Sequence, residues 1–220
     1  MSVAEALKNR VSTRAFLPDP VSHEEIVRIF SQAQQSPSNC NVQPWQIFIA
    51  SGEARNRLQE QLVREVRAGK PIAPDFDWEL KYEGVLRNRQ VDCAVALYGA
   101  LGIGRDDRDA RNEAMLRNWM FFDAPHVAFF AMDRSNGMRG AVDLGIYAQS
   151  VALLMAEAGI GCCLQGALNQ HPGPVREIFG IPESLGILFG MSFGYADPNA
   201  AANNARTGRE PVANAVKFIE

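Results

Sequence analysis

The stretch at residues 138–158 constrains the fold more than any other, because it predicts one long helix that is apolar on nearly every side. Leu144, Tyr147 and Val151 recur at helical spacing, and Gly159 follows as a typical helix stop. Such a helix must be covered by other elements, which hide its apolar surface from water. We therefore place residues 138–158 at the centre of the fold and expect nearly all of them to be core.

Apolar runs elsewhere in the chain predict strands. They lie at residues 45–50, 126–132, 162–168 and 185–195. In the last run, bulky side chains alternate with mostly small ones, which predicts that the bulky residues share one face of a strand. These residues are Leu185, Ile187, Phe189, Met191 and Phe193.

Two capping signals predict helices near the N-terminus. Ser2 with Glu5, and Ser22 with Glu25, each match the capping-box pattern that opens a helix. The first helix would lead directly into Arg10. The second would pack its apolar stripe on the core.

Three further helical patterns lie at residues 53–67, 83–101 and 108–122. Three residues share one face of the last pattern: Met115, Trp119 and Phe122. Because aromatic residues at helical spacing are usually core, this face is expected to be buried. The stretch at residues 69–78 contains two prolines and two aspartates, so it predicts an irregular segment. A specificity loop and an ordinary solvent loop are equally consistent with it.

Composition predicts one ordinary globular domain. The chain has 220 residues, of which 47% are hydrophobic and 21% charged, enough to bury a sizeable core. A net charge of -3 favours neither nucleic acid nor an acidic membrane surface as a partner. Because we find no signal-peptide pattern and no apolar run long enough to span a membrane, we expect the protein in the cytoplasm.

The cysteines and histidines predict neither disulfides nor a metal site. No pair has the CxxC spacing, and the histidines are too far apart for a metal motif. Free buried thiols in a reducing compartment are therefore expected. The residues concerned are Cys40, Cys93, Cys162, Cys163, His23, His126 and His171.

A polar loop feeds the first predicted strand, with the sequence SPSNCNVQPWQIF at residues 36–48. Serine and asparagine side chains satisfy nearby backbone groups, and Pro44 cannot donate to a sheet, so the loop should keep a fixed irregular shape. Asn39, Asn41 and Gln43 each offer donors and acceptors, which suits a flat polar ligand. An ordinary turn before a strand is the alternative.

Two arginines near the N-terminus suit phosphate. Arg10 and Arg14 flank Ser12. A guanidinium group is planar and always charged, so it binds phosphate oxygens in pairs, and a serine hydroxyl can add a hydrogen bond. Solvated surface charges are the alternative interpretation of this pair. The tail at residues 197–220 predicts an extended arm whose apolar ending at residues 212–219 forms a docked strand, with a floppy surface tail as the alternative.

One catalytic motif in the sequence is misleading. Residues 190–194 match the GxSxG pattern of serine hydrolases around Ser192. That nucleophile requires a sharp turn from strand to helix and a later histidine. Here the strand alternation continues through Ser192, and the last histidine is His171. We therefore interpret the match as coincidental.

Four motifs in order closely resemble the family of FMN-dependent nitroreductases. They are the segment at residues 10–16, the loop at 36–48, the GIGCCLQG run at 159–166 and the RTGREP run at 206–211. The resemblance extends from about residue 3 to the C-terminus. It implies an α+β fold, with a central mostly antiparallel sheet flanked by helices, in an intertwined homodimer. It also implies one domain at residues 1–220, with a helical excursion at about 69–122 covering the active site and an arm at about 197–220 crossing to the partner.

The resemblance also implies which residues bind the cofactor, FMN. Arg10, Ser12 and Arg209 would hold its phosphate, and Arg14 would lie nearer the flavin pyrimidine. Relatives often carry a lysine where this chain has Thr207, and either Thr207 or Arg206 would take the place of that lysine. Many relatives have glutamate at the position of Gln165. The implied FMN-binding set is Arg10, Ser12, Arg14, Pro37, Ser38, Asn39, Asn41, Gln165, Gly166 and Arg209. Within it, Gln165 and Gly166 would act through their backbone amides near flavin N5. The implied substrate pocket is Met115, Trp119 and Phe122.

The implied activity is the reduction of nitroaromatic compounds by NADH or NADPH, through nitroso to hydroxylamino products. Hydride would pass through flavin N5 in ping-pong fashion, with flat aromatic substrates stacking on the ring. Within the family, residues 86–111 and 118–125 look most like the enzymes acting on nitrobenzene or nitrobenzoate. A quinone, enone or free-flavin reductase of the same family, and a flavin-binding module without turnover, are the alternatives.

Overall fold

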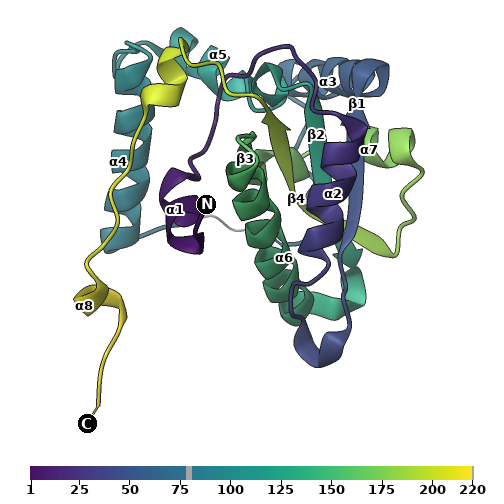
Figure 1. Cartoon of the computed structure of the whole chain (residues 1–220). Helices are drawn as coiled ribbons and strands as arrows, with labels where there is room; N and C mark the ends of the chain where they lie inside the picture. The colour runs from purple at the N-terminus through teal and green to yellow at the C-terminus, as the bar shows by residue number, and fades with distance from the viewer. Residues whose placement is uncertain (78–80, 220) are drawn as a thin grey trace.

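The computed structural model describes residues 1–77 and 81–219, built around a four-stranded sheet. Its strands are β1 (Gln46–Ser51), β2 (His126–Asp133), β3 (Gly161–Gln165) and β4 (Leu185–Gly194). Their order is β1-β2-β4-β3, and every neighbouring pair is antiparallel. Figure 1 shows helices flanking the sheet. The predicted α+β fold with an antiparallel sheet is thus confirmed.

Eight α-helices and five short 3₁₀ turns lie within the described residues. The helices are α1 (Val3–Asn9), α2 (His23–Ala33), α3 (Gly52–Arg67), α4 (Gly84–Ala100), α5 (Arg108–Leu116), α6 (Gly137–Glu157), α7 (Pro172–Phe179) and α8 (Val212–Ala215). The 3₁₀ turns are η1 (Asn39–Asn41), η2 (Phe121–Asp123), η3 (Arg134–Asn136), η4 (Gly166–Asn169) and η5 (Ala201–Asn204). The capping box of Ser2 and Glu5 is formed, and the Ser22 side chain caps α2 by accepting from the Glu25 N–H.

Two hydrophobic cores lie on opposite faces of the sheet, because alternate residues of β2 enter different clusters. The first cluster joins α2 and α6 to the sheet, and the second joins α3 and α7 to it. Ala128, Phe130 and Met132 belong to the first, whereas Val127, Phe129 and Ala131 belong to the second. Tyr147 of α6 packs in the first core, stacked on Trp45 with ring centroids 4.6 Å apart.

A β-bulge breaks the predicted alternation of β4. Phe130 pairs with Phe189 and Ala131 pairs with Ile187, so Leu188 is an extra residue in β4. Met191 and Phe193 lie in the first core, whereas Ile187 lies in the second. The prediction that all five bulky residues of this strand share one face was therefore wrong beyond the bulge.

Two predicted elements end earlier than expected. The helix predicted at residues 108–122 stops at Leu116, and the strand predicted at 162–168 stops at Gln165. Phe121, Phe122 and Asp123 all have positive φ, which a helix cannot accommodate. Arg55 of α3 stabilises this turn by donating to the carbonyls of Met120 and Ala124, at 3.1 and 2.9 Å.

The irregular segment after α3 is anchored by Asp75. Its carboxylate accepts from Arg134 at 2.6 Å, from Arg176 at 2.7 Å and from the N–H of Ile187 at 2.8 Å. The ring of Phe76 packs directly against Gly186, and a Cβ atom on Gly186 would lie 2.5 Å from that ring. Residues 69–77 are thus irregular as predicted but docked on the body. Trp78, which closes the predicted segment, lies outside the described residues.

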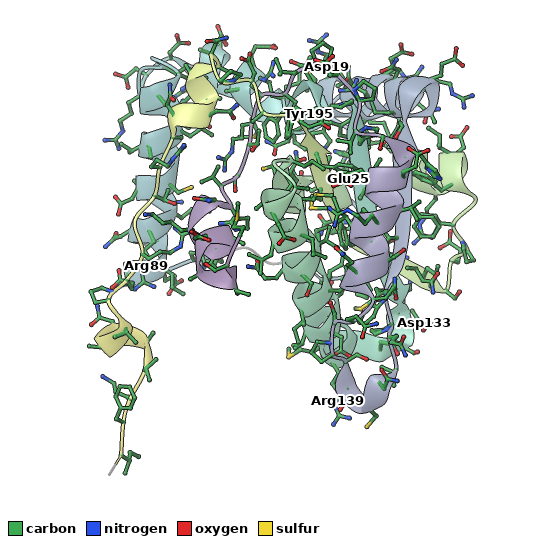
Figure 2. All side chains as sticks on the ribbon, viewed as in Figure 1. Asp19, Glu25, Arg89, Asp133, Arg139 and Tyr195 are labelled. Carbon is green, nitrogen blue, oxygen red and sulfur yellow. The ribbon has the colours of Figure 1, made fainter. Side chains whose placement is uncertain are left out.

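Helix α4 and the C-terminal segment extend away from the sheet (Figure 1). No residue of α4 is buried, and Val95 is 65% exposed. The arm runs past α4 close to Arg89 (Figure 2). Glu210 of the arm pairs with Arg89 at 3.1 Å. The strand expected at residues 212–219 is wrong for this chain, because the helix α8 forms instead and Phe218 is 79% exposed.

Helix α6 is central, as predicted, but only one side of it is core. Leu144, Tyr147 and Val151 are buried, whereas Met138 and Val142 are exposed. The expectation that nearly all of this helix is core was therefore wrong for its outer face. Within residues 1–77 and 81–219, none of the helices is long and apolar enough to cross a membrane.

Candidate functional site

The N-terminal segment that follows α1 lies along the outer edge of β3. Ser12 forms a parallel bridge with Cys162, and the N–H of Thr13 donates to the Cys162 carbonyl at 3.0 Å. Gly161 makes this approach possible, since a Cβ there would lie 2.6 Å from the Thr13 hydroxyl oxygen. The sheet edge therefore fixes the backbone that carries Arg10, Ser12 and Arg14.

The start of the C-terminal arm lies beside the same segment. The N–H of Leu17 donates to the Tyr195 carbonyl at 2.8 Å, and Phe16 bridges Ala196. Further along, the side chain of Asn203 accepts from the N–H of Arg14 at 2.7 Å. The two ends of the chain are thus joined where their arginines gather. Sequence reasoning did not single out Asn203, whose only signal was an arm rich in asparagine and alanine.

A cavity of about 340 Å³ lies between α1, α4 and the arm. Its lining is Leu7, Lys8, Arg10, Val11, Ser12, Arg14, Cys93, Leu97, Ala205, Arg206, Thr207 and Arg209. Five of these residues are cationic, and none is acidic. Arg206 and Arg209 donate to backbone carbonyls of their own segment, and Arg209 also to the Thr207 hydroxyl at 3.1 Å. We call this set of cations, with Ser12 and Thr207, the cationic cradle.

The composition of the cradle favours an anion with several oxygen acceptors. Clustered cations repel one another unless a counter-charge is present, and no carboxylate lines this cavity. Guanidinium forks and hydroxyl groups are the donors that phosphate prefers. The structure therefore brings together four of the predicted cofactor residues, Arg10, Ser12, Arg14 and Arg209, and adds Lys8, which sequence reasoning missed.

The buried thiols beside the cradle are not candidate nucleophiles. Burial raises the pKa of Cys162 to about 12. Burial also raises the pKa of Cys163, although the charge of Arg14 and a hydrogen bond with Ser12 act in the opposite direction. Both thiols therefore stay protonated at neutral pH and act as small core side chains. All four cysteines are free, but Cys40 and Cys93 are exposed, so the expectation of burial was wrong for those two.

The polar loop at residues 36–48, which we call the amide loop, begins just after α2 and lies away from the cradle. No residue of this loop lines the cavity. Its shape is fixed: the N–H of Asn39 donates to the buried Asp143 carboxylate of α6 at 3.1 Å, and the N–H of Gln43 donates to Ser38 at 2.9 Å. Pro37, Asn39 and Asn41 are exposed. One chain therefore presents the loop without bringing it to the cradle.

Gln165 and Gly166 lie where β3 passes into η4. The Gln165 side chain is buried and donates to the backbone carbonyl of Asn118 at 3.0 Å, while its oxygen accepts from Ser192. This side chain is fully engaged inside the protein. A cofactor role at this position would have to use backbone groups, as the resemblance implies.

The predicted substrate-pocket residues are separated by the early end of α5. Met115 is 52% exposed. Trp119 is buried in the second core, edge-on to His171, and Phe122 is buried in a small cluster with Phe16 and Cys163. These positions do not share one helix face, so that expectation was wrong. The role of the three residues in a pocket stays a prediction.

The hydrolase alternative finds no support. Ser192 is fully buried inside β4, and its hydroxyl donates to Gln165. The only serine hydrogen-bonded to a histidine among the described residues is Ser51, which contacts His126 Nδ1 at 2.5 Å. Nε2 of His126 accepts from the N–H of Val21, so Nδ1 carries the proton and cannot activate Ser51. In the part of the chain that the structure describes, no group of three metal-binding side chains comes together.

Comparison with known proteins assigns the chain to a family. A sequence model described as the nitroreductase family matches residues 7–195. The chain belongs to the nitroreductase family. It is 39% identical to the nitroreductase NfnB of Mycolicibacterium smegmatis (strain ATCC 700084 / mc(2)155), over 96% of this chain and 90% of that one. It is 32% identical to a 4-nitrobenzoate reductase of Pseudomonas putida, over 96% and 92% of the two chains.

Solved structures of the nitroreductase family agree. The crystal structure of the FMN-dependent nitroreductase NfnB from Mycobacterium smegmatis in complex with NADPH superposes with a TM-score of 0.95, at 38% identity, covering 99% of this chain and 98% of that one. The predictions of the family, of an enzyme and of the nitroreductase fold are thereby confirmed. The residue roles that the resemblance implied stay predictions, supported for the cradle by its geometry.

Proposed function

We propose that this nitroreductase binds FMN and uses NADH or NADPH to reduce nitroaromatic compounds. The observation that carries the proposal is the cationic cradle, which gathers five cations from both ends of the chain with no acidic residue. An FMN-dependent relative that matches nearly the whole chain, solved with NADPH, supports the same cofactors here.

The cradle fits the phosphate of FMN. Arg10 and Arg209 would grip its oxygens with charge-assisted hydrogen bonds, and Ser12 and Thr207 would add hydroxyl donors. Arg206 would supply the charge that the lysine of many relatives provides at the position of Thr207. When bound, FMN supplies the hydride chemistry through N5, while this chain's residues hold the phosphate and orient the ring.

We also propose that the site is completed in a homodimer. The amide loop, with Pro37, Ser38, Asn39 and Asn41, lies away from the cradle of its own chain, so a second chain must bring its loop to the cradle. Apolar residues on α1, α4 and the outer face of α6 are exposed in one chain: Val3, Leu7, Val85, Leu86, Val91, Val95, Met138 and Val142. A second copy would cover such a surface. In this arrangement residues 1–220 form one domain, the excursion at 69–122 covers the site, and the arm at 197–220 crosses to the partner.

The substrate class follows from the relatives and from flavin chemistry. One relative is a 4-nitrobenzoate reductase and another a nitrobenzene nitroreductase of Ectopseudomonas oleovorans, 30% identical over 99% of this chain. Flat aromatic molecules stack well on a flat ring, which favours this substrate class. Residues Met115, Trp119 and Phe122 remain the proposed pocket, with Met115 the accessible one. The cytoplasmic location stays a prediction.

One experiment tests the cofactor, the donor and the reaction together. The purified protein is first examined for a flavin absorbance band, then treated anaerobically with NADPH or NADH, and then with nitrobenzene. We expect the nicotinamide to bleach the band and nitrobenzene to restore it. A protein that binds no added FMN would refute the proposal. Restoration by a quinone but not by nitrobenzene would instead assign it to the quinone reductases.

A further inference from the structure

The cradle depends on a contact between two segments that are far apart in sequence. Arg10 and Arg14 come from the N-terminal segment, whereas Arg206 and Arg209 come from the arm. The arm beyond residue 205 is largely exposed. Something must therefore hold the arm arginines in register with the N-terminal ones.

The side chain of Asn203 makes that connection with its amide oxygen and with both hydrogens of its amide nitrogen. Its oxygen accepts from the N–H of Arg14 at 2.7 Å. Its Nδ2 donates to the carbonyl of Ala15 and to that of Asp197, both at 2.9 Å. The side-chain amide of Asn203 thus ties Arg14 and Ala15 of the N-terminal segment to Asp197 at the start of the arm.

The backbone of Asn203 continues the connection into the cradle. Its carbonyl accepts from the guanidinium of Arg206 at 2.6 Å. Asn203 is therefore hydrogen-bonded directly to Arg14 of the N-terminal segment and to Arg206 of the arm. A shift of Asn203 would change the spacing between the two groups of cations.

We infer that Asn203 is a positioning residue that sets the phosphate selectivity of the cradle, an inference that rests on the proposed binding of FMN. Only a side chain with one acceptor and two donors in a plane satisfies all three partners. The neighbouring Asn204 is exposed and makes no side-chain hydrogen bond within the described residues. It is therefore a matched control on the same turn.

The test compares FMN with riboflavin, which has the same ring and lacks the phosphate. Dissociation constants for both are measured by flavin fluorescence with apoprotein of the wild type, Asn203→Ala, Asn203→Asp, Asn204→Ala and Asn204→Asp. We expect the Asn203 variants to bind FMN about tenfold more weakly or worse, with riboflavin binding unchanged. The Asn204 variants should match the wild type. Arg209→Ala is the positive control.

Two results would overturn the inference. One is a wild-type preference for FMN over riboflavin in both Asn203 variants. The other is an equal loss of FMN and riboflavin binding, which a general structural role would produce. If Asn203→Ala does not fold, Asn203→Asp keeps the size of the side chain and the bond from Arg14. A wild-type protein that does not prefer FMN over riboflavin would refute the phosphate role of the cradle, and the proposed function would fail before the inference was tested.

Discussion

Removal of the Asp75 carboxylate is expected to destabilise the fold strongly. The side chain of Asp75 is 5% exposed, and that of its partner Arg176 is 13% exposed. Asp75→Ala would leave the Arg176 charge buried without its counter-ion and the N–H of Ile187 without an acceptor. The second partner, Arg134, is 39% exposed, so its loss should matter little.

The size of the effect follows from these contacts. Breaking a buried ion pair from one side costs about 3 to 5 kcal/mol. Arg176 would still donate to the carbonyls of Pro182 and Leu185, which favours the lower end of that range. A loss of about 3 kcal/mol in a chain of this length lowers the midpoint of thermal unfolding by about 6 to 12 °C.

The measurement is urea and thermal unfolding of apoprotein at one fixed concentration, because self-association would also affect stability. Asp77→Ala is the matched control, since Asp77 is exposed on the same segment and should change the free energy of unfolding by about 0.5 kcal/mol or less. The double variant Asp75→Ala with Arg176→Met removes the unpaired charge and should recover stability relative to Asp75→Ala. An Asp75→Ala variant within about 1 kcal/mol of the wild type would refute this account of the anchor.

Three further predictions concern the cradle and the pH dependence of folding. Arg209→Ala should raise the Kd for FMN roughly 10- to 150-fold in a fluorescence titration, because a charge-assisted hydrogen bond is worth about 1.5 to 3 kcal/mol. Gly161→Ala should also weaken FMN binding in that titration, since its Cβ would displace Thr13 and the segment that carries the N-terminal arginines, whereas Gly173→Ala, with open space around it, should not. Burial lowers the pKa of His126 from 6.5, so the unfolded chain takes up the proton first, and urea midpoints should be highest above about pH 6.5 and fall as the pH drops below it.

Each of these predictions has a control and a contrary result. Arg57→Ala removes an exposed arginine of α3 and should leave the FMN affinity unchanged. Equal affinities for Arg209→Ala and Arg57→Ala would remove Arg209 from the site. Full FMN affinity in Gly161→Ala would show that the contact with Thr13 does not hold the cradle. If His126→Gln loses stability with acid as steeply as the wild type, the loss belongs to other groups.

Local signals in the sequence predicted local structure well. The capping box of Ser2 and Glu5 needs only residues three apart, and the stop of α6 just before Gly159 needs one residue with left-handed backbone. The four strands were found because their apolar runs must be buried wherever they pair. The cofactor-binding residues came from the family resemblance and not from such patterns.

The misplaced boundaries depend on contacts that no local pattern contains. Residues 108–122 hold no glycine or proline, and the helix ends at Leu116 where a turn is held by Arg55 from α3. The extra residue Leu188 is defined only by the pairing of β4 with β2. Asn203 is one amide in an arm rich in asparagine, and only its three partners distinguish it from Asn204.

The cradle joins the first and last parts of the chain, and this has a consequence for protein synthesis. When Arg10 leaves the ribosome, Arg206 and Arg209 have not yet been translated, so the phosphate-binding residues come together only after the arm has also emerged. The sheet and both cores, by contrast, use residues up to Gly194 and can form earlier. Binding of the FMN phosphate thus depends on the last part of the chain to emerge, and a chain truncated before Arg206 would keep the sheet and both cores but lack half of its cradle.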